Sequence, residues 1–210
     1  MSDTLVRIRA KSSIPLDKWG MSTFYSFVGF TPATEHFAVH LGTSLDNVPL
    51  VRMHSECITG DLFGSLRCDC GKQLEESLQR FATEGGLLLY LKQEGRGIGL
   101  FAKLEAYNLQ DSGLDTFEAN TQLNHPEDAR DYACAAAMLK AMDIYHIRLI
   151  TNNPEKAQQL KDYGITIEEI LPTGVYSTPH NLSYLRAKAR KGHKLPISHI
   201  PLPQDTYEAP

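Results

Sequence analysis

The N-terminal quarter of the chain alternates between apolar and polar positions, which is typical of β-strands. Residues 24–30 (FYSFVGF) and 36–42 (HFAVHLG) combine this alternation with aromatic and β-branched side chains. A further strand, 49–57 (PLVRMHSEC), runs directly into a loop rich in cysteine. We therefore expect residues 1–50 to form strands and turns.

From residue 72 onward the apolar positions change to alternating helical and strand patterns. Leu74, Leu78 and Phe81 lie on one face of a helix that Gly85 and Gly86 should end. The pattern further predicts strands over 87–93, 146–154 and 166–172, and helices over 101–113, 129–144, 155–165 and 181–193. The polar segment 115–128 should be irregular. This order predicts an α/β fold, with a mixed sheet flanked by helices and an N-terminal antiparallel β extension.

The 210 residues show no internal repeat and no convincing linker, which favours one domain over residues 1–195. The end of the chain, KLPISHIPLPQDTYEAP, contains four prolines and little apolar periodicity. We expect residues 196–210 to be a disordered, proline-rich tail.

Composition and charge exclude several classes of protein. The formal net charge of −4 argues against a nucleic-acid partner. No run of 18 apolar residues exists, so we expect no membrane association. The N-terminus lacks the apolar core of a signal peptide, which predicts a cytoplasmic location where thiols stay reduced.

Three of the four cysteines are spaced C-x10-C-x-C, at Cys57, Cys68 and Cys70. Three thiolates with an open fourth position are typical of a catalytic zinc site, which is the favoured interpretation. A structural zinc closed by a distant ligand and a cluster of metal-free thiols remain alternatives. His54 should point to the opposite face of its strand from Cys57. Cys134 lies in an alanine-rich helix, where it should act as a small core residue.

Several basic residues lie in turns or at predicted helix starts, where backbone N–H groups favour anions. They are Arg52, Arg67, Arg96, Arg130 and Lys156. Glycines 95, 97 and 99 would allow a ligand to approach the backbone closely. The basic helix predicted at 181–193 is interpreted as a solvated face.

Taken together, the motifs resemble GTP cyclohydrolase II, an enzyme family of riboflavin biosynthesis. They are RMHSECITGDLFGSLRCDCGKQL, YLKQEGRGIGL, DTFEAN, DAR and RLITNNPEK, in that order, within a resemblance that spans residues 15–195. The resemblance implies a zinc-dependent homodimer of α/β fold. It also implies conversion of GTP to 2,5-diamino-6-ribosylamino-4(3H)-pyrimidinone 5′-phosphate, formate and pyrophosphate. Only about fifty residues precede the cysteine motif, which indicates the monofunctional form.

The resemblance also implies roles for individual residues. It assigns one zinc ion to Cys57, Cys68 and Cys70, and catalytic roles to Asp128, Arg130 and Tyr107. The substrate contacts that it implies are Arg52, Met53, His54, Ser55, Glu56, Gln73, Glu94, Gly95, Arg96, Thr116, Thr151 and Lys156. Mg²⁺ should accompany the triphosphate, held mainly by phosphate oxygens and water.

Two features differ from the family pattern. Met53 stands where valine is common, and LNHPED replaces a more usual Leu-Gly-Phe segment. Asn124 can adopt the left-handed conformation of a glycine, which would preserve that turn.

Several alternatives stay open at this point. Arg130 is either a covalent nucleophile or a charge stabiliser, and Glu56 either neutralises an arginine or contacts the guanine or the zinc water. The chain could instead stop at the formamido product, use another purine nucleotide, or be a non-catalytic nucleotide-binding module stabilised by zinc.

Overall fold

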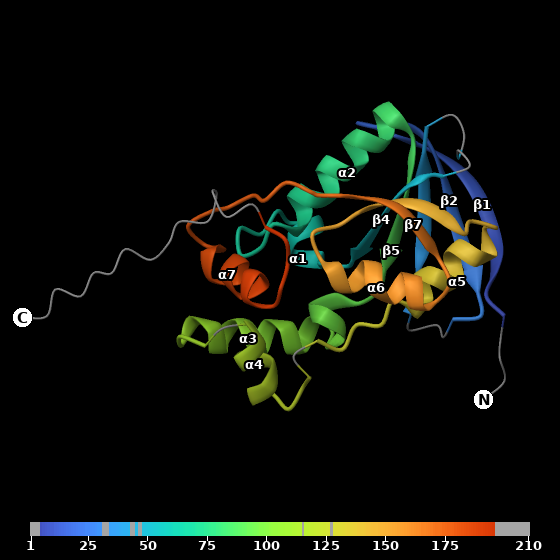
Figure 1. Ribbon diagram of the computed structural model, residues 1–210. Helices are drawn as coiled ribbons and strands as arrows, with labels where there is room; N and C mark the ends of the chain where they lie inside the picture. The colour runs from blue at the N-terminus through green and yellow to red at the C-terminus, as the bar shows by residue number, and fades with distance from the viewer. Residues whose placement is uncertain are drawn as a thin grey trace, which may run out of the picture.

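The computed structural model describes residues 5–30, 34–42, 45, 48–114, 116–126 and 128–195. Within these residues the chain forms a seven-stranded mixed sheet flanked by helices (Figure 1), which confirms the predicted α/β class. The strands are β1 (Arg7–Leu16), β2 (Gly20–Val28), β3 (Phe37–Leu41), β4 (Leu50–Ser55), β5 (Gly86–Leu91), β6 (His146–Ile150) and β7 (Thr166–Leu171). The helices are α1 (Ile58–Asp61), α2 (Cys70–Glu84), the 3₁₀ helix η2 (Glu94–Gly97), α3 (Leu100–Asp111), α4 (Thr116–Gln122), α5 (Ala133–Ala141), α6 (Pro154–Asp162) and α7 (Leu182–Arg190).

The sheet has the strand order β1-β2-β3-β5-β4-β6-β7. The strands β1, β2 and β3 pair antiparallel and form the predicted N-terminal extension, and β3 also pairs antiparallel with β5. The last four, β5, β4, β6 and β7, pair parallel. The carboxyl ends of parallel strands meet at one edge, where α/β proteins place their ligands. The residues that follow β4, β5 and β6 therefore lie at the same edge of the sheet.

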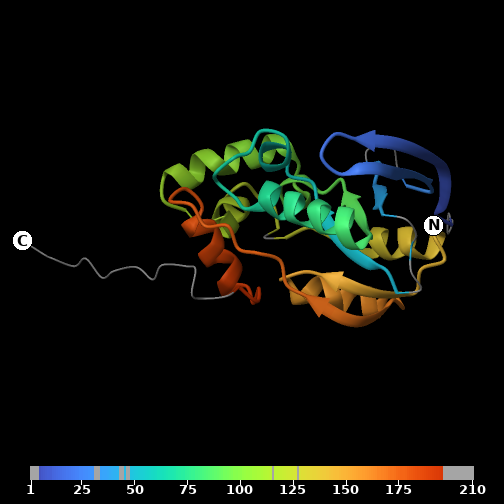
Figure 2. The ribbon, with the colours of Figure 1, turned by 90° about the horizontal axis from the view of Figure 1, so that it is seen from above.

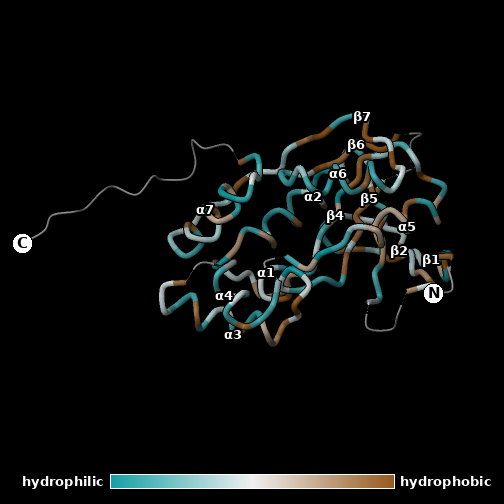
Figure 3. The backbone as a smooth tube through the Cα atoms, turned by 60° about the horizontal axis from the view of Figure 1, so that its bottom comes forward, coloured by the Kyte–Doolittle hydropathy of each residue, from teal (hydrophilic) through white to brown (hydrophobic). Residues whose placement is uncertain are grey.

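Alternating residues of the central strands bury two separate cores. Val51 and Met53 of β4 pack with Leu87 and Leu89 of β5 beneath α5 and α6. On the opposite face, Leu88 joins a core that includes residues of α2. Figure 3 shows apolar positions concentrated along the central strands. This two-sided burial explains why β5 reads as a continuous apolar run.

The helices α3, α4 and α7 lie together at the end of the molecule remote from the β1–β2 hairpin (Figures 1 and 2). Their position matters because the segments that follow β4 and β5 run into the same region. The helix predicted after residue 72 is confirmed as α2, which ends at Gly85 with a φ of +80°.

The sequence-based prediction was wrong in three places. Residues 115–128 were expected to be irregular, but Thr116–Gln122 forms α4. The helix predicted over 129–144 spans only Ala133–Ala141, and the short α1 was not predicted. Asn124 has a φ of +57°, which confirms the predicted left-handed turn.

The predicted tail, 196–210, lies outside the described residues. Among the helices of the described ranges, none has the length and apolar character needed to cross a membrane.

Candidate active site

A cavity of about 340 Å³ opens at the carboxyl ends of β4 and β5, and a smaller one of about 80 Å³ adjoins it toward β6. The two cavities share several lining residues, so they form one continuous site. The predicted residues that line the larger cavity are Ser55, Glu56, Cys57, Cys68, Cys70, Glu94, Gly95, Arg96, Tyr107, Asp128 and Arg130. Those that line the smaller cavity include Arg52, His54, Gln73, Thr151 and Lys156.

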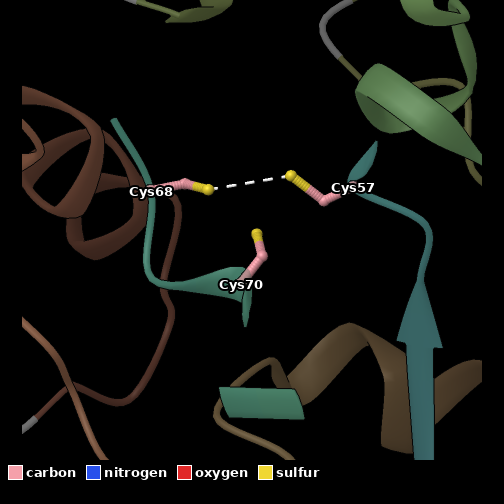
Figure 4. Close-up of side chains that lie close together, drawn as sticks. All are labelled: Cys57, Cys68 and Cys70. Atoms are coloured by element: carbon pink, nitrogen blue, oxygen red, sulfur yellow. Dashed lines mark hydrogen bonds between the residues drawn. The ribbon is translucent and has the colours of Figure 1, made fainter. Parts of the chain in front are cut away.

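The three cysteine sulfurs face one another across a small gap (Figure 4). All three lie within 4.8 Å of one another, and Cys57 Sγ is 3.7 Å from Cys68 Sγ. A zinc ion with Zn–S bonds of about 2.3 Å separates tetrahedral sulfur ligands by about 3.8 Å. The residues present therefore fit zinc. Within the described ranges, no further His, Cys, Asp or Glu belongs to this group.

Two glycines let the backbone pass close to the cysteine sulfurs. A Cβ built on Gly60 would lie 3.0 Å from Cys68 Sγ and 3.1 Å from Cys57 Sγ. Gly71 approaches so closely that its Cβ would lie 2.2 Å from the carbonyl oxygen of Gly60. The two glycines allow α1 and the start of α2 to bring the three thiols together.

Lys103 of α3 completes the surroundings of Cys57, and sequence reasoning missed it. Its Nζ lies 3.2 Å from Cys57 Sγ and 2.7 Å from Glu94 Oε1. Hydrogen bonds from the Cys68 and Cys70 thiols, together with Lys103, lower the pKa of Cys57 well below its ordinary value. In the sequence, Lys103 is an ordinary lysine in the first turn of the helix that follows the glycine-rich segment. A lysine at such a position is usually exposed, so its burial beside Cys57 could not be predicted.

Glu94 has a structural task in addition to its predicted substrate contact. It is buried, and its Oε2 accepts a hydrogen bond of 2.6 Å from the backbone N–H of Ile58. The carboxylate thus joins the segment after β5 to the segment after β4.

His54 contacts the cysteine loop through Asp61. Its Nε2 lies 3.0 Å from both carboxylate oxygens of Asp61, and Tyr90 donates a hydrogen bond of 2.8 Å to Asp61 Oδ2. The same carboxylate accepts the backbone N–H of Cys57 at 3.0 Å. His54 therefore acts on Cys57 through Asp61, as expected for a residue on the opposite face of the strand.

The glycine-rich turn positions the Asp128 segment. Gly95 and Arg96 both adopt left-handed conformations, with φ of +61° and +62°. Left-handed φ in a bulky residue is rare and occurs preferentially at functional sites. The Arg96 carbonyl accepts the N–H of Ala129 at 3.0 Å, and a Cβ on Gly97 would meet the Ala129 Cβ at 3.1 Å.

Asp128 and Arg130 form a two-point ion pair. Asp128 Oδ1 accepts from Arg130 Nε at 2.8 Å, and Oδ2 accepts from Nη2. Burial opposes ionisation of Asp128, but pairing with Arg130 holds its pKa below the ordinary value. Burial alone would lower the pKa of Arg130, yet Tyr132 and Asp128 hold that pKa above its ordinary range. The guanidinium therefore stays protonated.

Tyr107 lies beside the cysteines, on the α3 side of the larger cavity. The guanidinium carbon of Arg67 lies 4.3 Å from the centre of its ring. Arg67 also forms an ion pair with Asp111, which ties the cysteine loop to α3. Burial raises the pKa of the Tyr107 hydroxyl, so this group is protonated near neutral pH.

Cationic and amide groups line the smaller cavity. Arg52 Nη2 donates to Gln73 Oε1 at 3.1 Å, and Lys156 Nζ donates to the Met53 carbonyl at 2.7 Å. Thr151 lies at the end of β6, and Asn153 caps the N-terminus of α6 by accepting the N–H of Glu155. This end of the site is suited to an anion.

The remaining predicted contacts are more varied. Glu56 forms an ion pair with Lys92, and Ser55 Oγ donates to Gln93 at 3.5 Å. The Met53 side chain is buried in the core, and its carbonyl oxygen is the part directed to Lys156. Thr116 is the first residue of α4, and its side chain lies outside the described atoms.

The helix predicted to present a solvated basic face is α7, where Arg190 is exposed but the interpretation was wrong for Lys188. Tyr184, Lys188, Lys191 and His193 line the larger cavity. Lys188 Nζ lies 2.8 Å from Asp69 Oδ1, and the Tyr184 hydroxyl lies 3.6 Å from Cys70 Sγ. Lys188 of α7, with Lys191 and His193 after the helix, therefore belongs to the site.

Cys134 stands apart from the other thiols, on α5. It is partly buried against the core, and its Sγ lies 3.9 Å from Gln93 Nε2. Burial raises the pKa of its thiol to about 12. These surroundings agree with a packing role.

Residues 7–172 match the family model described as GTP cyclohydrolase II. The chain is 46% identical over 196 residues to "GTP cyclohydrolase-2" of Aliivibrio salmonicida. The aligned residues cover 92% of this chain and 98% of that protein. It is 48% identical over 194 residues to "GTP cyclohydrolase-2" of Vibrio vulnificus, with 91% and 95% covered. The "Riboflavin biosynthesis protein RibBA" of Thermotoga maritima is 47% identical over 192 residues, which cover 91% of this chain and 49% of that protein.

Proposed function

The chain belongs to the GTP cyclohydrolase II family and is a hydrolase of riboflavin biosynthesis, and from this premise we propose its cofactor, substrate and products. The proposed reaction is zinc-dependent hydrolysis of GTP to 2,5-diamino-6-ribosylamino-4(3H)-pyrimidinone 5′-phosphate, formate and pyrophosphate. One zinc ion per chain is held by Cys57, Cys68 and Cys70.

One observation carries this proposal: the site has two chemically different ends. The sulfur cluster and Tyr107 lie in the larger cavity, while Arg52 and Lys156 line the smaller one. A nucleoside triphosphate has the matching asymmetry, with an uncharged base at one end and a polyanion at the other. We place the guanine near the cysteines and the phosphates near the cations.

A zinc ion bound by three thiolates would supply an activated water and a Lewis acid for opening the imidazole ring at C8. The chain's own residues position the reacting groups. The protonated Tyr107 hydroxyl orients or protonates a ring nitrogen, which is a general-acid role. The ion pair with Lys92 fixes the Glu56 carboxylate at the cavity wall, where it accepts a hydrogen bond from the guanine edge.

Water attacks the α-phosphorus and pyrophosphate leaves, with help from Asp128 and Arg130. A guanidinium is a very poor nucleophile while protonated, and the Asp128 pair keeps Arg130 protonated. We therefore assign Arg130 to stabilising charge on the phosphoryl group, as arginine does in other phosphoryl transfers. Asp128 orients the guanidinium through both oxygens. Mg²⁺ accompanies the triphosphate through phosphate oxygens and water.

We also propose that the protein is a homodimer. Leu62 and Phe63 after α1, and Phe101 and Leu104 on α3, expose large apolar side chains. A second copy of the chain would cover these side chains. The mass in solution, measured by light scattering, should equal two chains, and a mass of one chain would contradict this proposal.

The principal experiment incubates the purified protein with GTP and Mg²⁺ while formate, pyrophosphate and pyrimidinone absorbance are followed. We expect one zinc per chain and equal amounts of the three products. Cys68→Ser should lose zinc and formate release, whereas the matched control Cys134→Ser should retain both. Full zinc occupancy in Cys68→Ser would contradict the metal assignment. A product mass that retains the formyl group would contradict the full reaction.

The role of Arg130 has its own test. Arg130→Lys keeps the positive charge but loses the planar fork, so turnover should fall without vanishing. Intact-protein mass spectrometry of the parent enzyme, quenched during turnover, should show no adduct. An added mass of one guanylate unit on the peptide that contains Arg130 would show that it is a covalent nucleophile.

A further inference from the structure

The last described helix, α7, contributes to the site although it lies beyond the residues that match the family model, 7–172. Tyr184, Lys188 and His193 each line both cavities. Figure 1 shows α7 beside the α3–α4 region, at the end of the molecule where the cysteine loop lies. None of the residues predicted from sequence to bind substrate came from this segment.

The segment is held firmly in place by buried contacts. Leu185, Ala187 and Leu195 are buried, and Asn181 before the helix is fully buried. The backbone N–H of Lys194 donates to the Asn152 carbonyl at 2.8 Å, beside the end of β6. These contacts place Lys188 and His193 over the smaller cavity without help from a ligand.

The charge of the smaller cavity is strongly one-sided. Its lining contains six basic side chains, and no carboxylate among the described residues lines it. The six are Arg52, His54, Arg130, Lys156, Lys188 and His193. Three of them have acidic partners outside the lining, since Arg130 pairs with Asp128, Lys188 with Asp69 and His54 with Asp61.

Burial, and after it this crowding of positive charge, lowers the pKa of two of the side chains. Burial, together with Arg130, Arg52 and Lys188, lowers the pKa of Lys156 well below its ordinary value. Burial, together with Lys188, Arg130, Lys156 and Arg96, lowers the pKa of His193 to about 3. Cations held close together in a partly desolvated cavity repel one another, and a bound polyanion would relieve that repulsion.

On the basis of the proposed function, we propose that α7 and the turn after it form one wall of a binding site for the nucleotide's polyphosphate. Lys188 and the neutral ring of His193 donate hydrogen bonds to phosphate oxygens, opposite Arg52 and Lys156. The contact of Lys188 with Asp69 joins this wall to the loop that carries Cys68 and Cys70. The ion pair between Lys188 and Asp69 therefore supports both the phosphate wall and the cysteine loop.

The test compares full-length, zinc-loaded variants by calorimetry, with inorganic tripolyphosphate and with guanosine as separate probes. Lys188→Met should weaken tripolyphosphate binding about tenfold or more, as for loss of a charged hydrogen bond. His193→Gln should weaken it about threefold to tenfold, as for loss of a neutral one. Guanosine binding should not change in either variant.

Lys194→Met is the matched control, because Lys194 is an exposed lysine next to His193 and lines neither cavity. It should bind tripolyphosphate within about twofold of the parent. Zinc content and melting temperature are measured for every variant. If Lys188→Met loses zinc or fails to fold, His193→Gln decides the question alone.

Unchanged tripolyphosphate affinity in a folded, zinc-loaded variant of Lys188 or His193 would overturn this inference. That result would leave the proposed function intact if the parent still releases formate from GTP. Conversely, a parent that releases no formate but binds tripolyphosphate through Lys188 would refute the proposed reaction and support the phosphate wall.

Discussion

Gly60→Ala should separate metal affinity from the stability of the fold. Gly60 lies in α1 without a left-handed φ, so alanine suits the backbone and should favour the helix by about 0.5–1 kcal/mol. The new methyl, however, would lie 3.0 Å and 3.1 Å from the sulfurs of Cys68 and Cys57. Carbon atoms in contact prefer separations of about 3.5–4.0 Å, so each sulfur must retreat by about half an ångström.

The metal-free site and the zinc-bound site respond differently to this displacement of the sulfurs. Metal-free thiols can rotate away, whereas three sulfurs bound to one ion cannot. Overpacking of this kind costs about 1–3 kcal/mol, which corresponds to a loss of zinc affinity of about 5-fold to 150-fold.

Competition against a chromophoric chelator measures the zinc affinity of Gly60→Ala, and urea unfolding in excess chelator measures the stability of the metal-free protein. We expect the first to fall and the second to stay within about 1 kcal/mol of the parent. Gly71→Ala provides a contrast, because its methyl would strike a backbone carbonyl at 2.2 Å and should lower both quantities. Parent-like zinc affinity in Gly60→Ala would refute the argument that the sulfurs are packed to fit the ion.

Three further predictions concern single side chains. Lys103→Met removes the ammonium beside Cys57 Sγ and should lower zinc affinity about 10-fold to 100-fold, as measured by the same chelator competition. Cys134→Ala should keep one zinc per chain and full turnover, and should change the free energy of unfolding by about 1 kcal/mol in urea titrations; a large loss of turnover in a folded variant would contradict its packing role. Lys156→Met should gain stability relative to the parent most at low pH. Folding lowers the pKa of Lys156, so the unfolded chain binds this proton more readily than the folded chain does. The stability gained by Lys156→Met should therefore shrink as pH rises toward about 10. A difference in unfolding free energy between variant and parent that does not change with pH would contradict this reasoning.

Much of the fold was predictable because its elements are defined by local patterns. The aromatic alternation of residues 24–30 indicated a strand, and Leu74, Leu78 and Phe81 indicated α2 with its glycine end. The short helix α4 was missed because its sequence is mostly polar and it packs on α3 through tertiary contacts. Local pattern does not record such contacts.

The candidate site was predictable where spacing alone defines it. Cys57, Cys68 and Cys70 lie close together in sequence, and the fold brings their sulfurs together. Lys103 and Lys188 were missed for the opposite reason. Each is a lysine at an ordinary helical position, and only the packing of its helix turns the ammonium toward Glu94 or Asp69. A charge on a helix surface gives no sign of which neighbour will cover it.

The distance in sequence between the cysteine loop and α7 separates two events in the life of a growing chain. The segment from Cys57 to Cys70 leaves the ribosome early and lies within a single crossover between β4 and β5. The wall formed by α7 follows more than a hundred residues later, after β7. The three cysteines are therefore synthesised well before the α7 residues of the proposed phosphate wall, so the two parts of the site enter the growing chain at different times.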